Sequence, residues 1–417
     1  MSAQFGITAL GFLQSIMVTR ALGASGFGIW AIVLATNGLV LSFLAFRTPD
    51  ALTRFWKDSR ISAAPELRGA LLASALATEA ATRLLAFLII VGLAPVIAAS
   101  FLDQPAITAV FVIQGISTLA TITRETWFVL LRDERRFRRI ATVEFGTHAL
   151  QVALLTVVWT QGELTLTSLA IIVAGASVCR AGIQVCGILS YIRRYDLAGT
   201  VSIRSAWRMR GRLAGFWNLM FVGYLSGSLT TLVKQGDVIV LGYFVDAREV
   251  GLYRLAKQLV GLIQMALGNF SSVLYQDFNE QIQRGESVLL RTSIISIARI
   301  WTPIALVGIG IGAVFADPVV PLVFGREFQP SVPILHILLA GATLGICLFW
   351  VHPLLIATDR ARAFLNWVFG LILVTLPAMV FGAAYAGAHG MAIVIAVHWT
   401  AAQCAQARLV FPALKRN

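Results

Sequence analysis

Charge is scarce in this sequence. Only 13% of its 417 residues are Asp, Glu, Lys or Arg, whereas 58% are hydrophobic, and the mean hydropathy is +0.81. Soluble domains carry charge on about a quarter of their residues. The composition therefore excludes a soluble globular protein. It predicts an all-α polytopic membrane protein, because a lipid-exposed backbone must satisfy its hydrogen bonds internally.

Residues that build disulfides, metal centres and active sites are also scarce. The four cysteines, Cys179, Cys186, Cys347 and Cys404, lie in apolar runs and form no CxxC pair. The five histidines form no HExxH or other metal-ligand spacing. No GxSxG motif or phosphate-binding loop is present either. The sequence thus predicts no catalytic residue, no metal and no cofactor, and the protein is not expected to be an enzyme.

Acidic residues are outnumbered by basic ones, 20 against 33, which gives a net charge of +13. Such an excess favours nucleic-acid binding only where it forms a basic face on a soluble module. Here most Lys and Arg lie in the segments between apolar runs. We therefore expect no nucleic-acid partner, and the basic residues instead indicate how the chain is oriented in a membrane.

Apolar runs of spanning length follow one another along the whole chain. With about 20 residues required for each span, the sequence predicts about twelve transmembrane helices, at residues 2–19, 27–46, 72–100, 106–131, 140–160, 166–192, 214–244, 250–275, 292–315, 332–356, 363–385 and 388–408. The first run is short and starts at Met1, which leaves open a true start further upstream.

The loops between these spans differ in basic content. Those after even-numbered spans are rich in arginine, as in the segment 132–139, whereas those after odd-numbered spans contain only Arg20, Arg248 and Arg326. Because positively charged loops stay in the cytoplasm, we expect both termini to be cytoplasmic. The outer loops are then all short.

The predicted spans divide into two sets of six. The basic linker 193–213 separates an expected N-terminal lobe, residues 1–192, from a C-terminal lobe, residues 214–417. ASGFGIWA at 24–31 matches AREVGLYR at 247–254, so that Gly28 aligns with Gly251. Because six spans separate the copies, this repeat predicts pseudo-symmetric lobes and a site between them.

Ionisable side chains inside the apolar runs are the candidate functional residues. A charge near the centre of a membrane helix costs about 2.5–3.5 kcal/mol by insertion scales, so such residues usually face a cavity or a pathway. The stretch 231–259 places Lys234, Asp237, Arg254 and Lys257 in or beside two predicted spans. The other charges within predicted spans are Glu79, Arg83, Arg124, Glu125, Glu144, Arg180 and Arg299.

The spacing of these charges allows two interpretations. Arg254 and Lys257 share a helix face that has no acidic neighbour, and Arg299 has none within a turn, which favours a water-filled, anion-binding cavity over side chains that snorkel to the membrane surface. The alternative is neutralisation along a single helix by residues three or four positions apart. The pairs with that spacing are Glu79 with Arg83 and Lys234 with Asp237.

Three segments resemble the signatures of a known transporter family. They are RALGASGFGIWAIV at 20–33, GDVIVLGYFVDAREVGLYRLAKQL at 236–259 and PLVFGREF at 321–328. Their order and spacing resemble the polysaccharide transporter, or Wzx-type oligosaccharide flippase, family of the multidrug/oligosaccharidyl-lipid/polysaccharide exporter superfamily. The resemblance implies two six-helix lobes that carry undecaprenyl-diphosphate-linked oligosaccharide across the bacterial inner membrane by alternating access. It further implies that the transported oligosaccharide serves O-antigen, capsule or exopolysaccharide synthesis.

The same resemblance suggests roles for the charged residues. Arg20 and Arg54 match basic residues that face the cavity in related flippases. We expect the diphosphate to be held by Arg20, Arg54, Arg83, Lys234, Arg254, Lys257 and Arg299. Glu79 and Asp237 are the candidates for coupling to H⁺ or Na⁺. The expected partners are the lipid-linked oligosaccharide, membrane lipids and other polysaccharide-assembly proteins.

Two other functions stay open. An ion-coupled drug or cation antiporter of the same superfamily should have an acidic and aromatic site, whereas the predicted spans hold more basic than acidic residues. A membrane polysaccharide polymerase or ligase typically needs a large outer loop with catalytic basic residues. The short outer loops argue against it.

Overall fold

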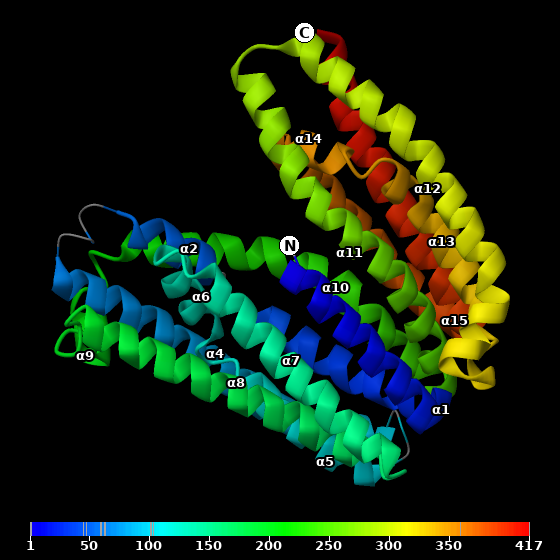
Figure 1. The fold of residues 1–417 in the computed structure, drawn as a ribbon, viewed down its shortest axis with the longest axis horizontal. Helices are drawn as coiled ribbons and strands as arrows, with labels where there is room; N and C mark the ends of the chain where they lie inside the picture. Colours follow the sequence, from blue (N-terminus) through cyan, green and yellow to red (C-terminus); the bar gives the residue numbers. More distant parts are fainter. Residues whose placement is uncertain are drawn as a thin grey trace. The chain divides into compact units, whose positions relative to one another are not determined.

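The computed structural model describes residues 2–44, 46, 48–58, 61, 64–100, 102, 104–358 and 360–416. These residues form helices joined by short connections, and no β-strand occurs among them (Figure 1). This confirms the predicted all-α class. The chain divides into two compact units: unit 1 comprises Met1–Leu22 and Ile32–Gly236, and unit 2 comprises Gly23–Ala31 and Asp237–Asn417.

Unit 1 is built on long helices packed side by side. Its elements are most of α1 (Ser2–Leu44), α2 (Thr48–Trp56), α4 (Pro65–Ser100), the short η1 (Pro105–Ile107), α5 (Thr108–Leu119), α6 (Arg124–Asp133), α7 (Phe137–Thr160), α8 (Leu166–Arg194), α9 (Ile203–Arg208) and the first part of α10 (Ala214–Phe244). Helix α4 packs on α5, α5 on α8, and α7 on α8 (Figure 1). One core cluster gathers large side chains such as Trp56, Trp127 and Phe216.

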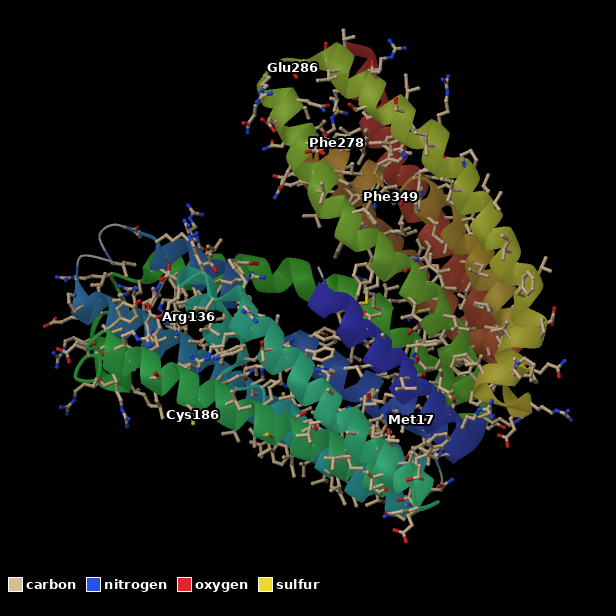
Figure 2. The ribbon with its side chains drawn as sticks, viewed as in Figure 1. Met17, Arg136, Cys186, Phe278, Glu286 and Phe349 are labelled. Carbon is tan, nitrogen blue, oxygen red and sulfur yellow. The ribbon has the colours of Figure 1, made fainter. Side chains whose placement is uncertain are left out.

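Unit 2 has the same construction. Its elements are the end of α10, α11 (Ala247–Gln283), α12 (Ser287–Phe324), η2 (Arg326–Phe328), α13 (Ser331–Cys347), α14 (Val351–Ala357) and α15 (Ala361–Arg416), together with the segment Gly23–Ala31 of α1. Helix α13 packs on α11, α12 and α15. A core cluster surrounds Phe278, with Phe349 packed against it (Figure 2).

Within the described chain, each of the twelve predicted spans lies mostly in helix. By length and composition, seven of the described helices can cross a membrane, or eight if α13 and α14, bent by 46°, form one span. The polytopic class is therefore confirmed, while the number twelve stays a prediction. The sequence pattern missed two breaks inside predicted spans. One separates α5 from α6 at residues 120–123, the other separates α13 from α14 at residues 348–350, and no Gly or Pro lies within either.

Two breaks inside long helices share the same features: a glycine with positive φ, followed by an alanine whose N–H donates to a glutamate. Helix α1 breaks at Gly23, with φ 66°, and α15 breaks at Gly387, with φ 52°. Such positive φ values favour glycine, which has no Cβ. At the first break the Ala24 N–H donates to the Glu327 carboxylate at 3.2 Å. At the second, the Ala388 N–H donates to Glu249 at 2.8 Å. Each carboxylate thus supplies an acceptor for a backbone N–H that the break leaves unpaired.

The boundary between the units differs from the predicted linker at 193–213. That linker contains α9, which packs on α4. Beyond it, Phe216 and Met220 at the start of α10 are buried in the same core cluster as Trp127. The beginning of α10 therefore belongs to unit 1 by its packing, although the hydropathy pattern assigned it to the second lobe. The division into six helices for each lobe stays a prediction.

The predicted repeat has a structural counterpart inside unit 2. A Cβ on Gly28 would lie 1.6 Å from the Ala247 carbonyl oxygen, and a Cβ on Gly251 would lie 2.1 Å from the Ala24 carbonyl oxygen. Ala24 aligns with Ala247 in the repeat, as Gly28 does with Gly251. Each glycine therefore meets the carbonyl oxygen of the first alanine in the other copy of the repeat. This reciprocal contact is expected of segments related by a local twofold axis.

Candidate functional site

The first charged cluster belongs to unit 2 and is centred on Asp237 at the end of α10. Its carboxylate is fully buried. The Oδ2 atom accepts a hydrogen bond from the Tyr253 hydroxyl at 2.5 Å and forms an ion pair with the Lys257 ammonium group. Tyr253 and Lys257 are one turn apart on α11 and so present their polar ends on one face. The buried negative charge is therefore held by two donors from the next helix.

This arrangement corrects one expectation about Lys257. The sequence pattern gave the helix face of Arg254 and Lys257 no acidic neighbour, because such a pattern covers only residues on the same helix. The structure supplies the acid from α10, where Asp237 meets Lys257. Lys234, the residue spaced to pair with Asp237 along α10, has an exposed side chain. Neutralisation thus occurs between helices at this position.

Arg254 differs from its neighbour Lys257. Its side chain is half-buried on α11 next to Tyr253, and it interacts electrostatically with Asp237. Among the described residues, no hydrogen-bond acceptor or ion-pair partner contacts its guanidinium group. Asp237 carries one negative charge for the two cations, so this part of unit 2 retains a net positive charge when all three groups are ionised. Arg254 can accept an anionic ligand.

The second cluster belongs to unit 1 and lies where α4 passes the break between α5 and α6. Glu79 on α4 is 2% exposed, and its Oε1 accepts a hydrogen bond from the Thr126 hydroxyl at 2.6 Å. A longer contact of 3.5 Å joins Oε2 to the Thr126 N–H. Thr126 lies in the first turn of α6, so the helix break brings its free backbone N–H toward the carboxylate.

Arg83 lies one turn further along α4 and is 6% exposed. Its Nε and Nη1 atoms have no hydrogen-bond partner among the described residues, although it interacts electrostatically with Glu79 and Glu125. The predicted Glu79–Arg83 ion pair is not formed within the described chain, because the Glu79 carboxylate is bound by Thr126. Arg83 is therefore a buried cation with free donors.

Further charges, of which Glu144 is buried and the others half-buried, extend this cluster. Arg124 and Glu125 approach to 3.9 Å at the start of α6, and Arg180 on α8 lies 3.5 Å from Glu144 on α7. The sequence identified these residues as intramembrane charges but assigned them no role. With Glu79 and Arg83 they make three acids and three bases within unit 1, so this group is electrically balanced when all are ionised.

The remaining predicted site residues lie at exposed positions. Arg20 is on α1, Arg54 on α2 and Arg299 on α12. No hydrogen bond or ion pair found in the described chain joins Arg54 or Arg299 to Asp237 or Glu79. The structure thus brings together Asp237 with Lys257 and Arg254 in unit 2, and Glu79 with Arg83 in unit 1. A shared role for all nine residues stays a prediction.

No metal site emerges from the described residues. Among them, no group of three or more His, Cys, Asp or Glu side chains is arranged to hold a metal ion. The four cysteines are free thiols, three of them exposed. Within the described part of the chain, the charged clusters thus consist of ionisable side chains with no metal-ligand set.

Comparison with known sequences identifies two similarities. A family model described as "Polysaccharide biosynthesis protein" matches residues 1–275. A teichuronic acid biosynthesis protein, TuaB of Bacillus subtilis (strain 168), is 28% identical over 145 residues, which are 33% of this chain. The match spans about 28% of the length of that relative.

Comparison with solved structures identifies the fold. An inward-facing multidrug resistance MATE family transporter of the MOP superfamily superposes with a TM-score of 0.74 at 15% identity, covering 99% of this chain and 96% of that one. The lipid II flippase MurJ, in an inward closed conformation, gives a TM-score of 0.75 at 11% identity, covering 98% of this chain and 86% of that one. The chain thus has the fold of these transporters.

Proposed function

The chain belongs to the family of polysaccharide biosynthesis proteins, and we propose that it is a flippase that carries a lipid-linked oligosaccharide across the bacterial inner membrane. Family membership places it in polysaccharide synthesis, as the segments that resemble Wzx-type transporters predicted. The fold shared with the lipid II flippase MurJ supports a lipid-linked substrate. The proposed topology keeps both termini in the cytoplasm, and the proposed partners are membrane lipids and other polysaccharide-assembly proteins.

The observation that carries this proposal is Arg254. A half-buried guanidinium on a membrane helix, with no acceptor among the described side chains, favours an anionic ligand. Guanidinium groups bind phosphate oxygens in bidentate fashion, which suits the diphosphate of an undecaprenyl-linked sugar. In unit 1, Arg83 has donors of the same kind with no partner among the described residues. Arg20, Arg54, Lys234, Lys257 and Arg299 complete the proposed set of cations.

Asp237 supplies a mechanism for coupling. Its carboxylate holds the Lys257 ammonium group and the Tyr253 hydroxyl. Binding of H⁺ or Na⁺ at Asp237 would cancel the charge that holds Lys257 and so leave a second cation beside Arg254. Glu79, held by Thr126, is the corresponding candidate in unit 1. The lipid-linked substrate would be bound when these acids are neutralised and released when they ionise again.

The test uses sealed inner-membrane vesicles from cells with and without the chain. The measurement is the leaflet in which the diphosphate-linked glycan lies. We expect the glycan to stay on the cytoplasmic leaflet without the protein. In vesicles that contain the Arg254→Ala variant, the rate at which the glycan crosses should fall about tenfold or more, because a charge-assisted contact is lost. Arg248→Ala is the matched control, since Arg248 is an exposed arginine at the start of the same helix. Unchanged sidedness without the chain would contradict the proposal.

A drug or cation antiporter is the alternative that the fold supports, because a MATE family transporter superposes on the whole chain. Its expected site is acidic, and the Asp237 carboxylate is already occupied by Lys257. Arg254 leaves a positive charge in the same place. A polymerase or ligase finds no support in the family or the fold. We therefore rank the flippase first.

A further inference from the structure

A shallow pocket lies in unit 1 where α6 ends and α7 begins. Its floor includes the apolar side chains of Trp127, Ile188 and Tyr191, and its rim carries Arg136, Arg139 and Arg194. Figure 2 labels Arg136 at the start of α7 and Cys186, next to the pocket residue Gly187 on α8. None of these residues belongs to the charged clusters assigned to transport.

A single carboxylate positions two of the rim arginines. Glu134 Oε2 lies 3.0 Å from Arg136 Nε, and its Oε1 lies 3.4 Å from Arg194 Nη1. The Tyr195 hydroxyl also donates to Oε1, at 3.3 Å. Arg139 has no acidic partner among the described residues. Three cations therefore share one anion, and the rim keeps an excess of two positive charges.

The floor holds a polar group that needs an acceptor. The Trp127 side chain is 1% exposed, and its Nε1–H has no hydrogen-bond partner in the described chain. A Cβ on Gly187 would lie 2.7 Å from that nitrogen, so the indole packs directly against the glycine backbone of α8. A buried indole N–H normally donates to some oxygen. Because the indole nitrogen is itself buried, a ligand in the pocket meets the rim arginines and not this group.

The N-terminus of α7 adds to this positive field. The helix begins at Phe137 directly after Arg136, with no side-chain cap and no acid in its first turn. Free backbone N–H groups and the helix dipole favour an anion at such an end. Phe137 itself is 58% exposed beside the rim, which offers apolar surface next to the cationic groups.

We propose that this pocket binds a phosphate group, carried by the head group of an anionic membrane lipid. The rim arginines contact the phosphate oxygens, while the exposed Phe137 contacts the glycerol and the first acyl carbons. Basic pockets between membrane helices on the cytoplasmic side commonly bind anionic head groups. The arginine-rich segment 132–139 that forms the rim is predicted to be cytoplasmic. The site is independent of the proposed transport function.

The experiment measures lipid retention by the full-length protein. Native mass spectrometry of protein released from micelles doped with phosphatidylglycerol gives the fraction that keeps one lipid. We expect Arg139→Gln to lower that fraction about fivefold, as the loss of one cation near a head group predicts. Arg139→Lys should keep most of it. Arg138→Gln is the matched control, because Arg138 is exposed, adjacent in sequence and outside the pocket lining.

A second variant and two further ligands separate the explanations. Gly187→Ala should also lower retention, because its methyl group would clash with the Trp127 indole and disturb the floor of the pocket. Equal retention of phosphatidylcholine, or equal retention by Arg139→Gln and Arg138→Gln, would overturn the proposal. A rise in Tm with inorganic phosphate in lipid-free detergent, lost in Arg139→Gln, would overturn the lipid source in favour of the free anion.

Discussion

Gly28 and Gly251 lie where the backbones of α1 and α11 approach so closely that neither position has room for a Cβ atom. Each glycine faces a carbonyl oxygen of the alanine four residues before the other, at Ala247 and Ala24 respectively. The reciprocity follows the sequence repeat. In the sequence these glycines stand in FGIW and VGLY, where they look like ordinary helix residues. Their positions are explained only by the backbone that each one touches.

The first prediction concerns this contact. Gly251→Ala should lower the free energy of unfolding by about 1–3 kcal/mol, because the added methyl group has no space and the helices must separate. The measurement is thermal unfolding of the purified protein in detergent. Gly261→Ala is the control: it lies on the same helix with nothing within 4 Å of its Cβ position. That control should be neutral or stabilising, since alanine favours helix. Equal values for both variants would show that the close contact does not constrain the fold.

The second prediction concerns the buried ion pair. Asp237→Asn leaves the Lys257 ammonium group without its anion, so we expect a loss of about 3–5 kcal/mol in unfolding free energy. The double variant Asp237→Asn/Lys257→Met removes both charges and should regain most of this loss. Thermal unfolding of both variants in one detergent measures the difference. If the double variant is as unstable as the single one, the pair is not the cause.

The third prediction concerns the hydrogen bond that joins α4 to α6. Thr126→Val removes the hydroxyl that donates to Glu79 and leaves a buried carboxylate with one long backbone contact. We expect a loss of about 1–3 kcal/mol, the usual penalty for an unsatisfied buried polar group. Thr126→Ser keeps the hydroxyl and should retain most of the stability. Identical unfolding curves for the valine and serine variants would contradict the assignment.

The sequence predicted the membrane class and the segments that became helices, because hydropathy over about 20 residues reflects a local property. It also located Asp237, Arg254 and Lys257 as unusual charges. It did not predict their partners. The spacing rules cover residues three or four positions apart, whereas Lys257 lies 20 residues from Asp237 and Thr126 lies 47 residues from Glu79. Contacts between helices depend on packing that no single-helix pattern contains.

The fourth prediction concerns the carboxylates at the helix breaks. Glu249→Ala removes the acceptor for the Ala388 N–H, which is 2.8 Å from Oε1 in the structure. Because loss of a helix cap costs about 1 kcal/mol, amide hydrogen exchange around residues 387–390 should accelerate about fivefold. Glu280→Ala serves as the control, since Glu280 pairs only with the exposed Arg284 among the described residues and lies at the other end of α11. Exchange at 387–390 that is unchanged in Glu249→Ala would mean that the glycine conformation alone holds the break, without the carboxylate. Acceleration confined to that variant would show that a single acid from the start of α11 fixes the break in α15.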